Sequence, residues 1–252
     1  MPFGLRHWAF LFATSIVCVS SALADELIVS AAASLTNALK EVGAAFEKRH
    51  PGDRVVFNFS ASGALLQQIE NGAPVDVFAS ADQETMNQAE AKRLIFAATR
   101  RNFVSNKLVL VQPKAAAVAV KSLADLAQAA VKRVALCNPV TVPAGRYARD
   151  VLQTEGLWVA LEAKFISADT VRQALDYVIR GEVDAAFVFA TDAAIARHKV
   201  SVVAVLATKE PIAYPIAVVA ASKHGTLADA FIGFVNEPGA QALLGNYGFG
   251  KP

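Results

Sequence analysis

Hydrophobic stretches of strand length alternate with amphipathic stretches of helix length along most of the chain. Strands are predicted at residues 27–29, 54–59, 75–79, 107–111, 133–137, 165–166, 183–189 and 214–219. Between them, apolar residues recur at helical spacing from residue 35, over 63–70, 83–92, from 122, from 144, over 170–180 and over 227–234. This alternation is typical of βαβ units, and it predicts an α/β fold whose mostly parallel sheets are flanked by helices.

The number of strands favours two lobes over a single sheet. We expect the late strand at 214–219 to pair with the strand at 107–111 and to return the chain to the first lobe. The final helix at 227–234 then packs there. The expected division is a signal peptide at 1–24, a first lobe of 25–106 and 223–252, and a second lobe of 107–222. Two crossings between lobes create a cleft, and clefts between domains are favoured ligand sites.

The first 24 residues have the composition of an export signal. Arg6 and His7 precede a mostly apolar stretch, and Ala22-Leu23-Ala24 forms a small-x-small cleavage site. A transmembrane anchor is the alternative, but the apolar stretch is short and no basic stop-transfer flank follows it. The expected location of the mature chain is therefore the periplasm.

Charge and cysteine content exclude several kinds of protein. The chain has 24 Lys+Arg and 22 Asp+Glu, and removal of the leader takes away only Arg6. Near-neutrality with interspersed signs argues against a nucleic-acid-binding surface. Cys137 is then the single remaining cysteine, in an apolar stretch typical of a buried strand. We expect no intramolecular disulfide and a monomeric protein.

Small residues occupy the junctions at which predicted strands give way to helices. Ser34 follows three alanines at the first junction, and Ser62, Ala144 and Thr170 occupy similar positions later. A helix start offers unpaired N–H groups and a positive dipole end, and a serine hydroxyl adds a further donor. Ser and Thr are also ordinary helix caps, which is the alternative at any single junction. The recurrence at several junctions favours anion binding.

The sequence contains no arrangement of residues that is typical of catalysis. The histidines after the leader lack metal-ligand spacing, and no nucleophile elbow, Walker loop or dinucleotide fingerprint is present. Asp76 and Asp82 are interpreted as capping and hydrogen-bonding residues within a lobe. Arg146 is interpreted as a solvated residue of a first helical turn, with a role at the cleft rim as the alternative. We therefore expect a binding protein that is not an enzyme, has no cofactor and holds no metal apart from that of its ligand.

Four segments resemble the periplasmic molybdate-binding proteins of the ModA type. They are AAASLT at 31–36, GAPVDVFASAD at 72–82, VPAGRYA at 142–148 and YGF at 247–249, and they occur in the same order as in that family. The resemblance implies a type II periplasmic binding protein that delivers molybdate, and also tungstate, to an ABC permease. It implies anion contacts from the hydroxyls of Ser34 and Ser62 and from the backbone amides of Ala144 and Val171.

One position departs from the family pattern. Phe189 stands where the family usually has a tyrosine whose hydroxyl touches the anion. The loss of one neutral hydrogen bond typically costs about 1 kcal/mol, unless water or Thr191 compensates. The alternatives to a molybdate receptor are a receptor for another oxyanion such as sulfate, an enzyme on the same scaffold, and a transcriptional effector domain. The effector domain would lack a leader, and the enzyme would need a catalytic group that is not evident.

Overall fold

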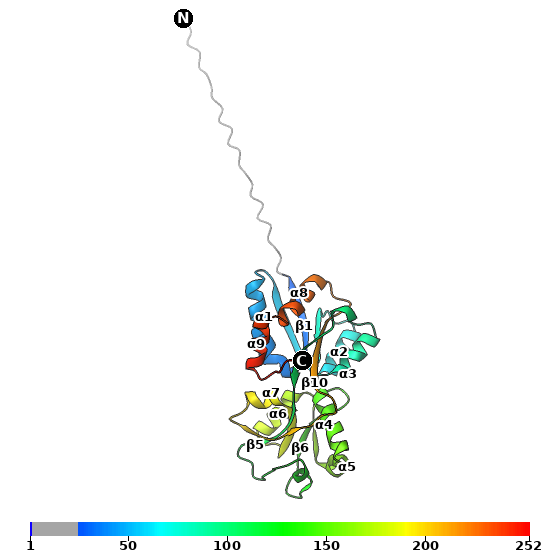
Figure 1. The fold of residues 1–252 in the computed structure, drawn as a ribbon, viewed down its shortest axis with the longest axis vertical. Coiled ribbons are helices and arrows are strands. Elements are labelled where there is room, and N and C mark those ends of the chain that lie inside the picture. The colour runs from blue at the N-terminus through cyan, green and yellow to red at the C-terminus, as the bar shows by residue number, and fades with distance from the viewer. Residues whose placement is uncertain (2–24) are drawn as a thin grey trace.

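The chain forms two lobes, each built on a five-stranded sheet (Figure 1). The computed structural model describes Met1 and residues 25–252, so the expected signal peptide and its cleavage site lie outside the described residues. The strand order is β2-β1-β3-β10-β4 in the first sheet and β7-β6-β8-β5-β9 in the second. The first sheet contains β1 (Glu26–Ala32), β2 (Arg54–Ser60), β3 (Val77–Ala79), β4 (Arg101–Asn106) and β10 (Ile212–Val218). The second contains β5 (Leu108–Pro113), β6 (Val134–Cys137), β7 (Phe165–Ala168), β8 (Ala185–Phe189) and β9 (Val200–Leu206).

Both sheets are mostly parallel, as predicted. In the first, β1 pairs in parallel with β2 and β3, and β10 is antiparallel to β3 and β4. In the second, β6 pairs in parallel with β7 and β8, and β5 is antiparallel to β8 and β9. Each sheet therefore has one reversed strand, β10 or β5. Ligand-binding edges of α/β sheets lie at the carboxyl ends of the parallel strands.

Helices cover both faces of the first sheet because its strands alternate apolar side chains between the faces. One face packs against α1 (Thr36–Arg49), α8 (Gly225–Val235) and α9 (Pro238–Asn246). There Phe46 meets Phe231 edge-on, with ring centroids 5.2 Å apart. The opposite face carries Phe78, which is buried with apolar residues of α2 (Ser62–Glu70) and α3 (Gln83–Ala91).

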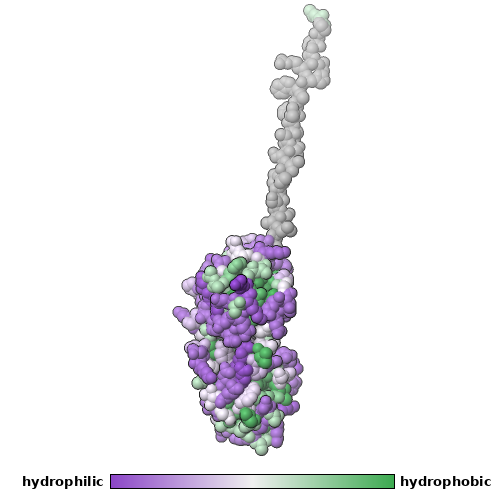
Figure 2. All heavy atoms as spheres, turned by 90° about the vertical axis from the view of Figure 1, so that its right-hand side faces the viewer, coloured by the Kyte–Doolittle hydropathy of each residue, from purple (hydrophilic) through white to green (hydrophobic). Residues whose placement is uncertain are grey.

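The second lobe packs its helices against the second sheet in the same way. These helices are α4 (Pro143–Thr154), α5 (Trp158–Leu161), α6 (Val171–Ile179) and α7 (Ala190–Ile195). On the face of the molecule shown in Figure 2, the surface is largely hydrophilic, with hydrophobic residues in patches on both lobes. One cluster of buried apolar residues runs through both lobes, and a smaller one lies beneath α2 and α3.

The structure corrects two expectations about local structure. The late strand at 214–219 does not pair with the strand at 107–111: β10 lies between β3 and β4 in the first sheet. Residues 212–218, which were expected in the second lobe, thus belong to the first sheet, and the chain crosses back before Ile212. The helix expected from residue 122 is only a 3₁₀ turn, Ala124–Ala127.

The second correction has a local cause. The carboxylate of Asp125 accepts the backbone N–H groups of Lys121 and Ser122, at 2.8 and 3.0 Å. These bonds, the one to Lys121 foremost, lower the pKa of Asp125. A side chain that captures nearby backbone donors offers the chain an alternative to a continued helix.

Candidate functional site

Two serines of the first lobe lie at the carboxyl end of its sheet, and their hydroxyls do not cap a helix. Ser34 lies in a 3₁₀ turn, Ala33–Leu35, between β1 and α1, and Ser62 is the first residue of α2. Both are buried, and neither helix start has a side-chain cap bond. The hydroxyl of Ser62 instead accepts the N–H of Ala81 at 3.0 Å. That of Ser34 lies 3.0 Å from the hydroxyl of Tyr214.

The second lobe contributes the N-terminal ends of two helices. Helix α4 begins at Pro143, and α6 begins at Val171 after Thr170, whose side chain accepts the N–H of Gln173 at 3.1 Å. The backbone N–H groups of Ala144 and Val171 make no hydrogen bond within residues 25–252. They are therefore available donors at the positive ends of helix dipoles.

A glycine lets α4 start close to its strand. A Cβ atom built on Gly145 would lie 2.2 Å from the carbonyl oxygen of Cys137, at the end of β6. Any other residue would push the first turn of α4 away from the sheet. The Gly in the VPAGRYA segment thus places the amide donors of α4 at the cleft.

These elements enclose a small cavity between the lobes. The space open to the centre of a water molecule is about 10 Å³, far below the range of about 300–1,000 Å³ typical of pockets for small organic molecules. Its lining is uncharged and comes from both lobes. The lining residues are Ala32, Ala33, Ser34, Ser60, Ala61, Ser62, Ala81, Val142, Pro143, Val171 and Phe189. The cavity suits a small ion held by hydrogen bonds better than a sugar or a peptide.

Four of the five predicted site residues line this cavity: Ser34, Ser62, Val171 and Phe189. Ala144 does not line it, but it is buried directly after Pro143, which does. Phe189 is buried at the end of β8 and offers no donor. Its ring meets those of Tyr214 and Tyr147 edge-on, with centroids 5.6 and 6.4 Å away. Burial raises the pKa of both tyrosines, so both hydroxyls keep their protons.

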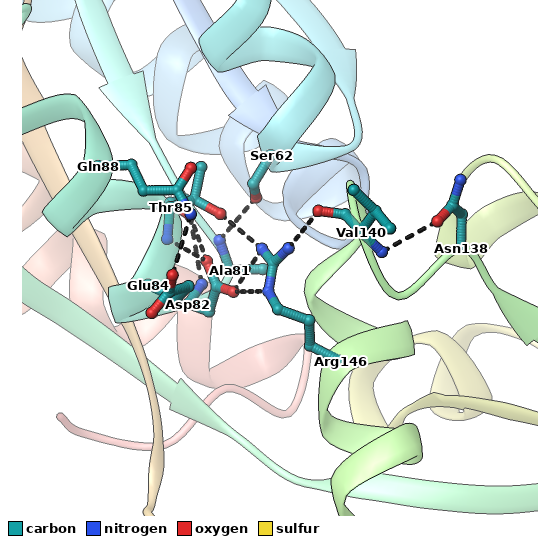
Figure 3. Close-up of polar contacts among 10 residues, drawn as sticks. Ser62, Ala81, Asp82, Glu84, Thr85, Gln88, Asn138, Val140 and Arg146 are labelled. Carbon is teal, nitrogen blue, oxygen red and sulfur yellow. Dashed lines mark hydrogen bonds and ion pairs between the residues drawn. The ribbon is translucent and has the colours of Figure 1, made fainter. Parts of the chain in front are cut away.

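An ion pair connects the lobes beside the cavity (Figure 3). Arg146 of α4 points across the cleft, and its Nε donates to the carboxylate of Asp82 at 2.8 Å. A second nitrogen of the guanidinium donates to the hydroxyl of Thr85 at 2.6 Å. Asp82 also caps α3 through the N–H of Thr85 at 3.1 Å, as predicted for this carboxylate. Of the two interpretations of Arg146, the structure favours the role at the cleft rim.

A second arginine makes a similar bridge from α6. The guanidinium of Arg172 donates to Asn37 at 3.0 Å and to the carbonyl oxygen of Ser34 at 3.3 Å, both in the first lobe. Its Nε lies 2.6 Å from the carboxylate of Asp192 in its own lobe, although the angle is too poor for a hydrogen bond. Burial raises the pKa of Asp192 to about 6, and the charge of Arg172 partly offsets this. Both guanidinium groups near the cavity are thus paired with carboxylates.

Sequence reasoning missed Tyr214, Asn106 and Arg172. The Nδ2 atom of Asn106 lies 3.1 Å from the hydroxyl of Tyr214, behind Ser34. Tyr214 and Asn106 are far from Ser34 in the sequence and lie outside the strand-to-helix junctions, whereas Arg172 lies in the first turn of α6 but reaches residues that are distant in the sequence. No local pattern distinguishes them from ordinary strand and helix residues.

Among the residues that the structure describes, no group of three or more His, Cys, Asp or Glu side chains is placed to hold a metal ion. Among the same residues, none of the helices has the length and apolar character needed to cross a membrane.

Comparison with known proteins agrees with the geometry. A sequence model of the family described as bacterial extracellular solute-binding proteins matches residues 27–250. The molybdate-binding protein ModA of Escherichia coli is 39% identical, with 97% of this chain and 98% of that protein aligned. The solved substrate-binding domain of a putative molybdenum ABC transporter from Clostridium difficile is 34% identical, covers 91% of this chain and 100% of its own, and has a TM-score of 0.69.

The periplasmic molybdate-binding protein of Azotobacter vinelandii shares the fold, with a TM-score of 0.78 at 24% identity over 90% of this chain and 99% of its own. The two sheets, the cleft between them and the order of elements are therefore those of a two-lobe periplasmic binding protein. The chain belongs to the bacterial extracellular solute-binding proteins, and within them it is a member of the ModA-type group.

Proposed function

We propose that this protein captures molybdate, and tungstate with similar affinity, in the periplasm and delivers it to an ABC permease in the inner membrane. The observation that carries the proposal is the small uncharged cavity whose polar groups are the hydroxyls of Ser34, Ser60 and Ser62 and the N-termini of two helices. The names of the relatives support the choice of ligand. The match to solute-binding proteins supports a binding role rather than catalysis.

The chemistry of the lining suits a fully ionised tetraoxo dianion. At neutral pH, molybdate carries no proton, so each of its oxygens only accepts hydrogen bonds. A lining of donors satisfies it, with Ser34 and Ser62 from one lobe and the amides of Ala144 and Val171 from the other. Hydrogen phosphate brings a proton for which the lining offers no carboxylate, and a proton left unpaired costs about 1–3 kcal/mol. Sulfate has the same charge and shape but shorter bonds, so cavity size must separate it from molybdate.

Binding from both lobes explains how transport is signalled. An anion that contacts Ser34 and Ser62 on one side and two helix ends on the other makes these contacts together only when the lobes are closed. Its differential affinity for the closed state shifts the population toward it. We propose that the permease recognises this closed monomer, and that nucleic acid plays no part.

The direct test is isothermal titration of the purified protein, without its leader, with molybdate, tungstate, sulfate and phosphate. We expect tight, nearly equal binding of molybdate and tungstate, weaker binding of sulfate and the weakest binding of phosphate. Tight sulfate binding without a response to molybdate would show that the site serves the alternative oxyanion. Ser34→Asp, which places a negative charge against the dianion, should abolish binding. Undiminished affinity in that variant would remove Ser34 from the site.

A further inference from the structure

We propose that Tyr214 and Asn106 are positioning residues that fix the direction of the Ser34 hydroxyl, so that its hydrogen is free to donate to the bound anion. The inference rests on the proposed function, because it concerns the selectivity of the same site. Neither residue lines the cavity, so each affects ligand discrimination only through Ser34.

The first step is the orientation of the Asn106 amide at the end of β4. Its oxygen accepts the backbone N–H of Lys107 at 2.9 Å. The NH₂ group therefore faces the other way, toward Thr191 Oγ1 at 2.9 Å and Tyr214 Oη at 3.1 Å. An amide nitrogen only donates, so Tyr214 Oη must accept from it.

The second step is the proton of Tyr214. This residue is fully buried, and its ring is held edge-on by Phe189 and by Phe249, at centroid distances of 5.6 and 5.8 Å. Its oxygen accepts from Asn106, and its one hydrogen faces Ser34 Oγ at 3.0 Å. The phenol stays protonated because burial raises its pKa well above the usual value. Tyr214 is therefore the donor in its bond to Ser34.

The third step is the proton of Ser34. With its oxygen accepting from Tyr214, the hydroxyl has its own hydrogen left for the cavity that it lines. The hydroxyl of Ser62 also keeps its hydrogen free, because its oxygen accepts the backbone N–H of Ala81. Each hydroxyl therefore has its hydrogen available for the anion. With one of its two lone pairs already occupied, it is a poorer acceptor for the proton of a protonated oxyanion.

Tyr214→Phe tests this directly because it removes the proton that Ser34 Oγ accepts and keeps the ring. The Ser34 hydroxyl is then free to turn, and both of its lone pairs are available to a ligand proton. We expect molybdate affinity to fall about fivefold, as for one lost neutral hydrogen bond, while hydrogen phosphate binding improves or stays the same. The ratio of the two affinities should therefore fall at least as far as molybdate affinity does. Dissociation constants come from calorimetry at a mildly alkaline pH, with phosphate measured by competition against molybdate.

Two variants make the experiment decisive. Tyr177→Phe on α6 removes a hydroxyl that has no hydrogen bond within the described residues, and it should leave both affinities unchanged. Asn106→Asp keeps the shape but puts an acceptor opposite Tyr214, so the chain of bonds reverses and Ser34 loses its free donor. The added charge lowers the affinity of every anion, and the reversal should lower the ratio in addition. This variant also serves if Tyr214→Phe fails to fold.

The outcomes separate the inference from the proposed function. A loss of molybdate and phosphate affinity by equal factors in both variants would show a merely structural role and overturn the inference. If the wild type prefers sulfate, the proposed ligand is wrong, yet the ratio of sulfate to hydrogen phosphate tests the inference equally well. If the wild type binds no tetraoxo anion, both proposals fall.

Discussion

The side chain of Phe189 lies at the anion cavity without offering it a hydrogen bond. It is buried at the end of β8, next to the rings of Tyr147 and Tyr214. We predict that Phe189→Tyr, which adds a donor at this wall, raises molybdate affinity about fivefold, the gain expected of one neutral hydrogen bond. Calorimetric titration of both proteins with molybdate measures this change in affinity.

A matched control places the same hydroxyl far from the cleft. Phe165 lies at the start of β7, whereas the anion site is at the carboxyl ends of the strands. Phe165→Tyr should leave the affinity unchanged. An unchanged or lower affinity in Phe189→Tyr would mean that its hydroxyl does not face the anion, and that the wall at this position is closed by packing alone.

The buried carboxyl group of Asp192 should make the free energy of unfolding depend on pH. Burial raises its pKa to about 6, whereas its ordinary value is 3.8. A carboxyl group with a raised pKa in the folded state stabilises the fold fully below its ordinary pKa, and this contribution is lost as pH rises through the folded pKa. The loss between about pH 4 and about pH 7 is at most on the order of 3 kcal/mol.

Asp192→Asn isolates this contribution because its side chain does not titrate. We predict that the wild type gains stability relative to the variant as pH is lowered from about 7 to about 4. Urea unfolding of both proteins across this range gives the difference directly. A difference that is constant with pH, or that grows in the opposite direction, would show that the carboxyl group is not shifted upward in the folded protein.

The sequence allows only part of the site to be predicted, and the division has a physical reason. Ser34 and Ser62 are recognisable because each lies where a strand-like stretch turns into a helix-like one. The contacts of Tyr214, Asn106 and Arg172 are not, since each acts through a partner distant in the sequence. Local patterns carry information about element ends, and these contacts depend on how two sheets are placed against each other.

At the scale of elements, the start of α2 meets the loop before α4 across the cleft. The N–H of Gly63 donates to the carbonyl oxygen of Thr141 at 2.9 Å. A Cβ atom at position 63 would lie 2.6 Å from that oxygen and 2.9 Å from the Cα of Thr141. Because both are backbone atoms, no side-chain rotation relieves the clash. The lobes close fully only with glycine here.

We predict that Gly63→Ala weakens molybdate binding by roughly tenfold or more while stability without ligand stays equal or rises slightly. The clash penalises only the closed state, and alanine favours a helix over glycine by about 1 kcal/mol. Calorimetry and urea unfolding measure the two quantities. Gly233→Ala in α8, where a Cβ atom meets nothing within 4 Å, gives the stability effect alone. Equal affinities in the two variants would contradict the proposed contact in the closed state.

The predicted strands and helices differ from the observed ones where pairing between distant segments determines the structure. The strand predicted at 214–219 is present as β10, but it lies between β3 and β4 of the first sheet and not beside β5 of the second. The pattern gave no prediction for β9 or α9. β4 begins with exposed polar residues, Arg101 and Asn102, since it lies at the edge of its sheet. Edge strands lack the two-sided burial that makes a strand recognisable.

At the scale of the whole molecule, several contacts between the lobes lie around the cavity, and three of them depend on glycine or arginine. They are the Gly63–Thr141 backbone bond, the bridge from Arg146 to Asp82, and the bridge from Arg172 to Ser34 and Asn37. Each arginine also faces a carboxylate, Asp82 or Asp192. The positive charges therefore hold the lobes together and leave recognition of the anion to neutral donors. This arrangement preserves discrimination among anions, which a free cation in the cavity would weaken.

The Arg146 bridge connects closure to binding, because Asp82 loses its solvent when the lobes meet. In the closed state the Asp82 side chain is 4% exposed and that of Arg146 is 14% exposed. Removal of the guanidinium leaves a buried carboxylate without its cation in the closed state alone, since the open state returns both side chains to water. Arg146→Gln should therefore shift the protein toward the open state and lower molybdate affinity roughly tenfold or more.

Small-angle scattering during a molybdate titration measures this shift, since closure reduces the radius of gyration. We expect Arg146→Gln to reach the compact form only at a correspondingly higher molybdate concentration, with an unchanged size in the absence of ligand. Arg149→Gln is the control on the same helix, because the ion pair of Arg149 is with its neighbour Asp150, at 3.5 Å. If both variants close at the wild-type concentration, the Arg146 bridge forms only after the anion has closed the lobes and contributes nothing to the free energy of binding.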